Sequence, residues 1–521
     1  MSVGVVLHYT SKSPYPPERI SNILDAIINQ NEEVSELIIL NNDAETDVDF
    51  DITSVKTTVI PLADITVSAQ LNKAIETAES DFILYIDNLA AEIYLKRSYI
   101  EAAQLIVEKY PRLGMLYADY ELITDGIKRE IPLLKYHVGR VRDNQDYGKV
   151  FFFSRNALKE VGYFDESVKY NTLYDIRLKL SEKFKIIHIA NKFSGSLYQV
   201  VAEGKKHNVF DYLLAGKESQ KEAENILTDH LKRIGAYLEP GAYYHKRPET
   251  IEEYKFLASV VIPVNNRPDF IETAIESVFQ QTEQNIEIIV VVNGGFDDPT
   301  TTAVESYMPG GTKYDQTKPS VTLIVTDINN IGLSLDLGIK KAKGKYYVQL
   351  DSDDRLKPDA VGKIIDVFDS DEKIGMVIGS YEMWEKKDTG KFFRIEEIPV
   401  VTHDEWTENN GRNNLLRVNG AGAPRSIPIQ IIKDMGYFGI NDEPYAQNYG
   451  EDYNLVLRIS EEYRIGRIWD PIYEVVRHSG GTDHSIDQHT IDRNDEAKDY
   501  MRMKTIERRI KINEQMSKCC H

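Results

Sequence analysis

The sequence predicts an α/β protein that consists of two tandem copies of one domain, followed by a charged helical tail. Its 521 residues are enough for roughly two to four domains of ordinary size. Each half alternates buried-strand signals with helical patterns, which is typical of a parallel, doubly wound sheet. Short segments of the first half also recur, in the same order, in the second half.

Three pairs of segments carry the internal repeat. SAQLNKAIETAESDFILYIDN, from Ser68, resembles GLSLDLGIKKAKGKYYVQLDS, from Gly332, at an offset of 264 residues. VGYFDES resembles MGYFGIN at an offset of 274, and KLSEKFKI resembles RISEEYRI at an offset of 279. Because the order is kept while the offset grows slowly, we infer the duplication of one domain of about 200 residues rather than a short repeat.

The repeat divides the chain into segments with different expected roles. The linker between the copies begins with a helical pattern and then contains Pro240 and Pro248. The tail is highly charged, with Tyr500, Met503 and Ile506 near helical spacing, which favours a helix that packs on the domain. The expected segments are 1–203 (first copy), 204–255 (helical linker), 256–485 (second copy) and 486–521 (helical tail).

Composition excludes several classes of protein. The chain carries 62 Lys and Arg against 83 Asp and Glu, a net charge of −21, which argues against a nucleic-acid binder and a polybasic membrane anchor. Its two cysteines, Cys519 and Cys520, form no disulfide framework. No signal peptide is read at the N-terminus, and no apolar run approaches the roughly 20 residues of a membrane span. We expect a cytoplasmic protein, either free or peripheral at a membrane.

An acidic turn follows the apolar strand KYYVQL in the second copy. It contains Asp351, Ser352, Asp353 and Asp354. Hard oxygen ligands on a short turn suit Mg²⁺ or Mn²⁺, and such a cation neutralises a leaving diphosphate. The plain alternative is a turn that leads into the next helix. Ligands of doubly wound sheets bind at this end of the strands.

Two further candidates lie later in the second copy. Glu451 and Asp452 start a helix, where a carboxylate either caps the helix or takes a proton from a hydroxyl nucleophile. His478 follows a strand-like run. Most single histidines are ordinary core or surface residues, but beside an acidic cluster a histidine completes a metal site.

The order of these motifs is more specific than any one of them. SVVIPVNNRPDFIETAIESVFQQT, VVVNGG, DSDD, GED and RHSGG follow one another in the second copy. This order resembles the family 2 glycosyltransferases, which have the nucleotide-sugar-binding GT-A fold. The resemblance is strong over about 256–485 and weak over 1–200. The whole chain looks like the tandem glycosyltransferases of bacterial O-antigen and surface-polysaccharide assembly, rhamnosyltransferase-like members included, with a degenerate N-terminal GT-A-like domain.

The resemblance implies a role for each matched position. It assigns the binding of the nucleotide sugar to Pro263, Val264, Asn265, Arg267, Asn293, Asp351 and Ser352. It assigns the binding of a Mn²⁺ or Mg²⁺ ion to Asp351, Asp353, Asp354 and His478. Asp452, with Glu451 beside it, matches the general base.

The resemblance also implies a reaction. Family 2 enzymes are typically inverting, so the acceptor hydroxyl, deprotonated by Asp452, would attack the anomeric carbon in one displacement while the nucleoside diphosphate leaves. The implied donor is a UDP- or dTDP-sugar, and the implied activity is that of a hexosyl- or deoxyhexosyltransferase. The implied acceptor is a hydroxyl of a surface glycan or glycolipid.

Two departures from the family pattern affect the donor site. Asn293 replaces the acidic residue that usually contacts the base, and an amide donates as well as accepts hydrogen bonds. GLSLDLG is shorter than the usual segment and lacks its arginine, so another cation, with Arg267 the first choice, is expected to meet the phosphates.

The first copy serves as an internal control. The repeat offsets place Leu89 and Ala90 at the positions of the later carboxylates of the DSDD turn. They place Thr172 and Leu173 at the positions of the GED carboxylates. Pairing Tyr198 with Tyr473 places Glu203 at the position of the histidine. Apolar residues are odd replacements for turn formers and helix caps, so the contrast favours a functional role in the second copy.

The stretch from Trp406 to Pro428 is rich in glycine and asparagine, which is typical of a loop. In this fold such a stretch often borders the acceptor site. Trp406 is therefore expected to stack on a sugar, and Arg412 or Arg425 to meet a phosphate. A surface loop with one buried tryptophan is an equally good interpretation.

Two other functions remain open from the sequence. A non-catalytic nucleotide-sugar- or carbohydrate-binding scaffold is favoured by Asn293 and the missing arginine, whereas the intact acidic motifs favour an enzyme. A transferase that acts on protein or modified nucleic acid is the other alternative, and the charge of −21 argues against the nucleic-acid version.

Overall fold

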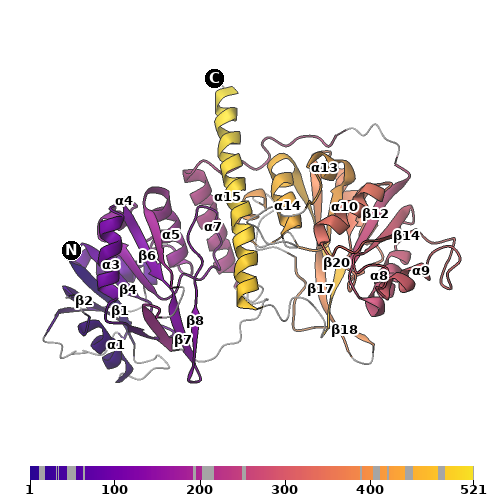
Figure 1. The fold of residues 1–521 in the computed structure, drawn as a ribbon. Coiled ribbons are helices and arrows are strands. Elements are labelled where there is room, and N and C mark those ends of the chain that lie inside the picture. Colours follow the sequence, from indigo (N-terminus) through magenta and orange to yellow (C-terminus); the bar gives the residue numbers. More distant parts are fainter. Residues whose placement is uncertain are drawn as a thin grey trace. The chain divides into compact units, whose positions relative to one another are not determined.

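The computed structural model divides the chain into two compact units, Met1–His230 and Leu231–His521, each with its own central sheet (Figure 1). We call them unit 1 and unit 2. Trp406, Glu203 and Cys520 lie outside the described residues. The structure describes residues 1–10, 18–30, 32, 34–43, 54–62, 65–191, 195–201, 216–248, 254–387, 390–402, 411–418, 420, 422–439, 450–478 and 487–519.

Unit 1 contains a seven-stranded sheet, in the order β10-β6-β9-β4-β1-β2-β3, and a smaller sheet, in the order β5-β11-β7-β8. Its strands are β1 (Val3–Tyr9), β2 (Glu36–Asn41), β3 (Lys56–Pro61), β4 (Phe82–Ile86), β5 (Glu92–Leu95), β6 (Leu113–Ala118), β7 (Tyr120–Thr124), β8 (Ile127–Ile131), β9 (Val150–Ser154), β10 (Lys185–Ile189) and β11 (Tyr198–Val201). Its helices are α1 (Glu18–Ile28), α2 (Val67–Thr77), α3 (Tyr99–Lys109), α4 (Arg155–Glu160), α5 (Thr172–Lys183) and α7 (Lys217–Arg233), of which α7 continues into unit 2.

Helices cover both faces of the large sheet of unit 1. Val5 and Leu7 of β1 point into a core shared with α1 and α3, whereas Val6 points into a core shared with α2, α4 and α5. Successive side chains of a strand face opposite sides of the sheet. A strand buried on both sides therefore needs the near-continuous apolar run that the sequence shows.

Unit 2 contains a nine-stranded sheet in the order β14-β13-β12-β15-β19-β17-β20-β16, with β18 paired to β17. Its strands are β12 (Phe256–Val264), β13 (Ile286–Val292), β14 (Ser320–Val325), β15 (Gly344–Gln349), β16 (Arg355–Leu356), β17 (Ile374–Lys386), β18 (Phe392–Arg394), β19 (Arg425–Pro428) and β20 (Arg464–Arg477). Its helices are α8 (Pro268–Phe279), α9 (Thr300–Glu305), α10 (Ile331–Lys341), α11 (Ala360–Ser370), α12 (Gly411–Asn414), α13 (Ile429–Asp434), α14 (Glu451–Glu462) and α15 (Gln488–Cys519).

The main sheets of the two units have the same strand order. β3-β2-β1-β4-β9-β6-β10 of unit 1 corresponds to β14-β13-β12-β15-β19-β17-β20 of unit 2. In both, the fifth strand (β9 or β19) runs antiparallel to its neighbours. The α/β class is confirmed, but the expectation of a wholly parallel sheet is wrong. Strand β19 lies within the stretch from Trp406 to Pro428 that the sequence predicts as a loop, so neither the strand nor its direction was predicted.

Equivalent elements begin at the repeat offsets read from the sequence. Helices α2 and α10 are both 11 residues long and begin 264 residues apart, and α5 and α14 are both 12 residues long and begin 279 residues apart. In each GYF turn the tyrosine has a left-handed backbone, with φ of 63° at Tyr163 and 68° at Tyr437. Few non-glycine residues adopt that region, so the shared turn is a specific likeness.

Equivalent side chains fasten this turn in the two units. Asn72 of α2 accepts a hydrogen bond from the Phe164 N–H at 3.0 Å and donates to its carbonyl at 2.9 Å. Asp336 of α10 accepts from the N–H groups of Phe438 at 2.9 Å and Gly439 at 3.0 Å. Asp336 and Phe438 are related to Asn72 and Phe164 by the repeat offsets.

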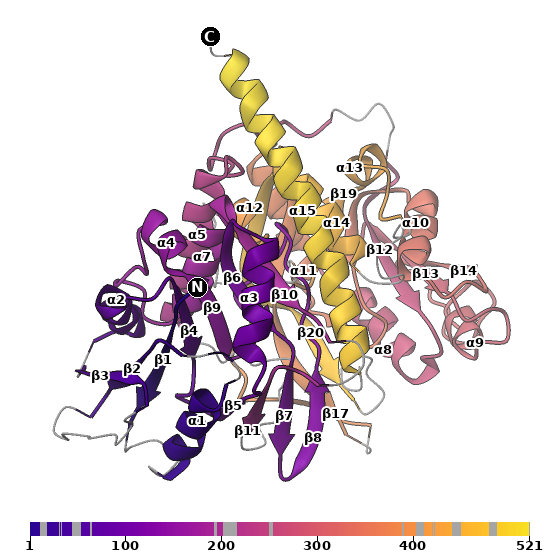
Figure 2. The ribbon, with the colours of Figure 1, turned by 60° about the vertical axis from the view of Figure 1, so that its left-hand side comes forward.

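The helical C-terminal segment is confirmed as the single helix α15, which packs beside α14 (Figure 2). Its most deeply buried face is polar: Asp499, Arg502, Thr505 and Arg509 are all 0% exposed. Of the apolar residues expected to form the seam, Ile506 is buried, whereas Tyr500 and Met503 are only partly covered. No helix among the described residues is long and apolar enough to cross a membrane.

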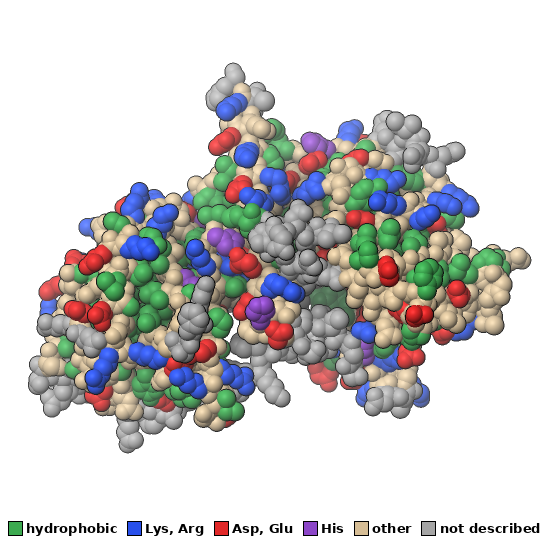
Figure 3. Space-filling view, in the orientation of Figure 1, with side chains coloured by type: hydrophobic (Ala, Val, Ile, Leu, Met, Phe, Trp, Pro, Cys, Tyr) green, Lys and Arg blue, Asp and Glu red, His purple; other side chains and the backbone are tan. Residues whose placement is uncertain are grey.

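Figure 3 shows the distribution of charged side chains on one face of the molecule. On this face, acidic and basic side chains are interspersed over both units.

Candidate active site

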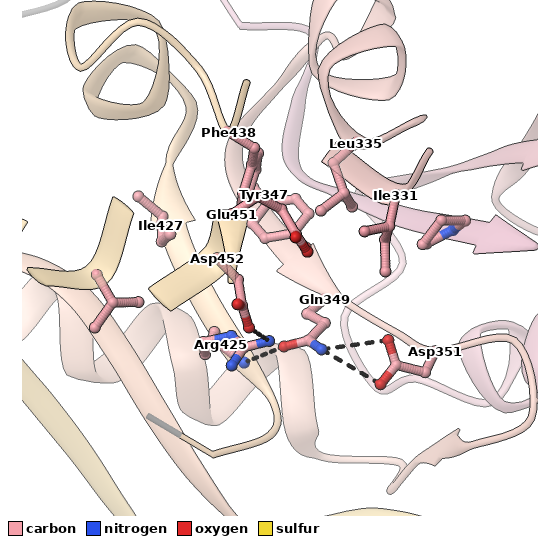
Figure 4. A pocket seen from close by; sticks show the side chains of 12 residues that line it. Ile331, Leu335, Tyr347, Gln349, Asp351, Arg425, Ile427, Phe438, Glu451 and Asp452 are labelled. Carbon is pink, nitrogen blue, oxygen red and sulfur yellow. Dashed lines mark hydrogen bonds and ion pairs between the residues drawn. The ribbon is translucent and has the colours of Figure 1, made fainter. Parts of the chain in front are cut away.

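The candidate site lies where the parallel strands β12, β13 and β15 of unit 2 end. These strands pair in parallel, so their carboxyl ends meet at one edge of the sheet. The start of α14 and the antiparallel strand β19 close the same edge around a cavity of about 130 Å³ (Figure 4). The cavity is lined by Pro263, Ile331, Leu335, Tyr347, Gln349, Asp351, Arg425, Ile427, Phe438, Glu451, Asp452 and Val456.

Asp351 lies two residues beyond the end of β15 at Gln349. Its N–H donates to the hydroxyl oxygen of Tyr473 at 3.0 Å, and its carboxylate accepts from the Gln349 amide at 3.3 and 3.4 Å. Burial and the neighbouring charge of Asp353 raise the pKa of Asp351 to about 6. The neighbouring positive charge is thus not enough to offset the burial of this carboxylate and its repulsion by Asp353, as expected at a cation site.

Asp353 and His478 come together from two different elements. The imidazole Nε2 of His478, just beyond β20, lies 2.9 Å from the Asp353 Oδ2. The histidine ring packs on Phe270, with ring centroids 4.2 Å apart. The expected apposition of a late histidine with the acidic turn is therefore present in the structure. Among the described residues, however, no group of three or more His, Cys, Asp or Glu side chains is assembled as a metal site.

Asp354 and Ser352 are turned into the protein. The Asp354 Oδ1 accepts the N–H of Val476 at 2.8 Å, and burial raises the pKa of this carboxyl well above its usual range. Ser352 is also buried. Asp354, expected among the metal ligands, joins the acidic turn to β20 in this structure.

The carboxylate of Asp452 is held on both sides. Its Oδ1 accepts the N–H of Tyr453 at 2.6 Å, and its Oδ2 forms an ion pair with the Arg425 Nη2 at 2.7 Å. Burial opposes the ionisation of Asp452, but the charges of Arg425 and Lys498 outweigh it and lower the pKa. Asp452 is therefore an ionised, oriented carboxylate at the cavity wall.

Glu451 differs from its neighbour. Burial and the charge of Asp452 raise its pKa, and its Oε2 has no hydrogen-bond partner among the described residues. The residue before it, Gly450, occupies the N-cap with φ of 84° and offers no side-chain cap. Glu451 is thus no helix cap: its free oxygen belongs to the cavity lining.

The residues expected at the nucleotide follow β12 and β13. Val264 is buried and Pro263 lines the cavity. The side-chain oxygen of Asn293 accepts a hydrogen bond from the side-chain amide of Asn265 at 3.0 Å. The side-chain nitrogen of Asn293 donates to the Ser334 hydroxyl at 3.1 Å. An aspartate cannot donate to Ser334, so the asparagine fits a local network that needs both functions.

The cationic residues expected from the sequence lie in three different settings. The N–H of Arg267 donates to the Thr300 hydroxyl at 2.9 Å, and its guanidinium is not among the cavity-lining groups. Arg425 lies in the cavity wall against Asp452. Arg412 is 3% exposed and donates to backbone carbonyls. Its acceptors are Ser460, Glu461, Glu239 and Ala242.

This burial corrects the expectation for Arg412. A guanidinium that satisfies carbonyls of α14 and of the segment before β12 stabilises the interior and does not face the cavity. The Gly- and Asn-rich pattern around Arg412 indicates a loop, and loops seldom hold buried arginines. Trp406 is outside the described residues.

Some site residues were not found from the sequence. Gln349 links Asp351 to β19, and Tyr473 supports the same aspartate from β20. Tyr473 could have been found from the repeat, because Tyr198 stands at the equivalent position of unit 1. There the Tyr198 hydroxyl accepts a hydrogen bond from the Lys149 N–H at 2.9 Å. Lys498 comes from α15, and the sequence gives no indication that this helix approaches the site.

In unit 1 a hydrogen-bond network of side chains lies at the ends of the equivalent strands β1 and β2. The His8 Nε2 lies 3.0 Å from the Tyr85 hydroxyl, and its Nδ1 lies 3.3 Å from the Asn42 amide. Asn42 in turn accepts from the Gln70 amide at 2.8 Å. Leu173, at the position of Asp452, packs against the hydrophobic core.

This network predicts a pH-dependent stability of unit 1. Burial lowers the pKa of His8 from its ordinary value of 6.5 to about 4. Between these values the unfolded chain binds a proton that the folded chain excludes, so acidification from pH 7 to 5 should cost about 2 kcal/mol at this residue. Thermal unfolding at the two pH values tests this, and His8→Gln should reduce the difference. An unchanged pH dependence in the variant would contradict the assignment.

Comparison with known proteins identifies the type of domain around this site. A model described as glycosyl transferase family 2 matches residues 259–419, which include the acidic turn. These residues of unit 2 are therefore similar to the family 2 glycosyltransferases. Helix α14 and His478 lie beyond the matched residues but line or border the same site.

Relatives of the family 2 domain carry matching names. An uncharacterized glycosyltransferase of Rickettsia prowazekii is 36% identical over 217 residues, which cover 42% of this chain and 61% of that protein. Chondroitin synthase of Escherichia coli is 30% identical over 139 residues, covering 26% of this chain and 19% of that protein. The matches cover 28% to 61% of the length of the rickettsial relatives.

Among solved structures, S. aureus TarS (residues 1–349) in complex with UDP is similar to the chain. The TM-score is 0.32 at 16% sequence identity, and the similarity covers 42% of this chain and 60% of that one.

Proposed function

We propose that unit 2 is an inverting, divalent-metal-dependent glycosyltransferase that moves a sugar from a nucleoside-diphosphate sugar to a hydroxyl acceptor. The observation that carries the proposal is the convergence of two acidic groups on one cavity. Asp351, at the end of β15, and Asp452, at the start of α14, both line it, in a domain of the glycosyltransferase family. One carboxylate belongs to the cation and donor side, and the other to the acceptor side.

The residues present fit a small divalent cation. Asp353 and His478 supply a carboxylate and an imidazole 2.9 Å apart. Asp351 adds a carboxyl group whose pKa is raised by burial and by the charge of Asp353. Mg²⁺ is usually held by one or two carboxylates plus substrate phosphates and water, so an incomplete protein site is what such an ion requires. When bound, Mn²⁺ or Mg²⁺ would neutralise the charge of the departing diphosphate.

The protein's own groups would then perform the proton transfer and the positioning. Asp452, ionised and held by two hydrogen bonds, would take the proton of the acceptor hydroxyl as that oxygen attacks the anomeric carbon. The bond from this carbon to the diphosphate oxygen breaks in the same displacement. Glu451, whose Oε2 is unpartnered among the described residues, would bind a hydroxyl of a sugar.

For unit 1 we propose a degenerate copy of the same domain, with the boundaries expected from the repeat. The shared strand order and the equivalent GYF turns support a duplication. Leu89 and Leu173 stand where the second copy has carboxylates, and His8 is hydrogen-bonded to the Tyr85 and Asn42 side chains. Unit 1 would therefore serve in structure, assembly or acceptor binding.

We propose a glycan or glycolipid as the acceptor, in keeping with a relative named chondroitin synthase. A UDP- or dTDP-sugar remains the first choice of donor, with a hexosyl or deoxyhexosyl unit transferred. We place the reaction in the cytoplasm or at the face of a membrane, as in surface-polysaccharide or O-antigen assembly. The two adjacent cysteines form no disulfide framework that would require an oxidising compartment.

The metal site gives a direct test. Asp353→Ala and His478→Ala should each weaken the activating effect of Mn²⁺ on nucleoside diphosphate release, by roughly 10- to 100-fold in the metal concentration required, because each removes a side-chain ligand. Manganese titrations of donor turnover measure this. Asp87→Ala, at the position in unit 1 equivalent to Asp351, is the matched control and should titrate like the unaltered chain. Identical titrations for all variants would contradict the metal site.

A further inference from the structure

The ion pair between Arg425 and Asp452 gives the arginine a role of its own. We propose that Arg425 is a positioning residue, which keeps the Asp452 carboxylate charged and in one orientation and is not a ligand of the donor's diphosphate. The proposal rests on the proposed function of unit 2, because it concerns the base of that reaction. It also supplies a function for a residue that the sequence placed at the acceptor.

Arg425 is fixed from both of its ends. It is the first residue of β19, and its N–H donates to the Gln349 Oε1 at 3.3 Å. Its Nη2 lies 2.7 Å from the Asp452 Oδ2, and the two side chains are 16% and 27% exposed. The Gln349 amide also donates a hydrogen bond to the Asp351 carboxylate. Gln349 and Arg425 therefore link Asp351 to Asp452 across the cavity (Figure 4).

The charges around Asp452 explain why an arginine is needed. Glu451 of α14 and Asp351, beyond β15, add negative charge, whereas Lys498 of α15 adds positive charge together with Arg425. If Arg425 were lost, Lys498 would be the one cation among these groups that offsets the three carboxylates of Asp351, Glu451 and Asp452. Carboxylates that share a site repel one another when charged, so the loss of Arg425 would raise the pKa of Asp452 and leave a larger fraction of it protonated and unable to accept another proton.

The first copy shows that the arginine is not required for the fold. In β4 and β9, Tyr85 lies opposite Phe151, as Gln349 lies beside Arg425 in unit 2. Phe151 is 2% exposed and stacks on Tyr85 with ring centroids 6.2 Å apart. Leu173 stands at the position of Asp452, so both members of the ion pair are apolar in unit 1.

A joint replacement of this kind separates the two explanations. An arginine that only stabilised the sheet could be replaced by an apolar side chain in either unit, whatever stood at the helix start. An arginine that serves the carboxylate is needed only where that carboxylate is present, which is the pattern seen. The same pattern argues against a primary contact with phosphate, because the guanidinium already binds the carboxylate across the cavity wall.

The test compares Arg425→Met and Arg425→Lys with the unaltered full chain. Release of nucleoside diphosphate is followed from pH 5 to 9 with UDP-, dTDP- and GDP-sugars and Mn²⁺, and the affinities for UDP, dTDP and GDP are measured by calorimetry. Arg464→Met is the matched control, since Arg464 pairs with Asp371 at 3.0 Å at the other end of the sheet.

We expect Arg425→Met to shift the acid limb of the kcat–pH profile upward by about one unit or more, so that activity lost near pH 6 returns at high pH. Removing a cation raises the pKa of the carboxyl, which then ionises only at higher pH. Arg425→Lys should restore most of the profile, and nucleotide affinity should stay within about twofold in both variants. A loss of nucleotide affinity of about tenfold with an unmoved acid limb would overturn the proposal in favour of a phosphate ligand.

A second measurement decides the pairing without turnover. Melting temperatures of Arg425→Met, Asp452→Asn and the double variant form a cycle in which the proposal predicts strong non-additivity. Additive shifts would overturn it. If the unaltered chain releases no nucleoside diphosphate from any donor, the proposed function fails, while the cycle still decides whether Arg425 governs Asp452.

Discussion

Replacing Asp452 by asparagine is expected to reduce the release of nucleoside diphosphate about 10²- to 10⁴-fold while leaving donor binding nearly unchanged. The amide cannot take the acceptor's proton, although it keeps the size of the carboxylate and its place at the cavity wall. Steady-state release assays and calorimetry with the same donor separate the two effects.

Asp470→Asn is the control for this experiment. Asp470 lies on β20 of the same unit, with its side chain 75% exposed and paired to Lys363 at 3.2 Å. This variant should retain full turnover. Full turnover by Asp452→Asn as well would mean that another group takes the proton.

Removing the buried carboxylate of Asp499 is expected to cost the folded state about 3–5 kcal/mol, which would lower the melting temperature by roughly 10 °C. Asp499 and Arg502 of α15 are both 0% exposed, with the Arg502 Nη1 2.5 Å from the Asp499 Oδ1. Asp499→Ala leaves a buried guanidinium without its counter-charge. Differential scanning calorimetry of unit 2 in the full chain measures the shift.

Glu507→Ala provides the comparison on the same helix. Glu507 pairs with Lys504 at 3.1 Å, but both side chains are nearly half exposed. Exposed pairs of this kind contribute little to stability, so the melting temperature should hardly move. Equal melting temperatures for Asp499→Ala and the unaltered chain would contradict a stabilising role of this buried ion pair.

The sequence predicted the layout of the α/β elements because that layout depends on apolar periodicity. The repeat offsets of 264 and 279 correctly located the equivalent helices α2 and α10, and α5 and α14. The acidic turn and His478 were also placed at one site, since strand ends of a parallel sheet share an edge. These features follow from local pattern and topology.

Other features depended on tertiary contacts that leave no local pattern. Strand β19 was predicted as part of a loop, because its four residues follow a stretch rich in glycine and asparagine. Arg412 was mistaken for a surface residue because its carbonyl partners lie far away in sequence. The polar seam of α15 was missed for the same reason: Arg509 is buried against the carbonyl of Arg412 and the hydroxyl of Ser460.

One assay of the full chain tests metal-dependent transfer by unit 2: nucleoside diphosphate release is measured with Mn²⁺ and with chelator for a panel of UDP-, dTDP- and GDP-sugars. We expect release from at least one donor that requires the metal and is lost in Asp452→Asn. Donor binding without any release would contradict this expectation and would identify a nucleotide-sugar-binding scaffold instead.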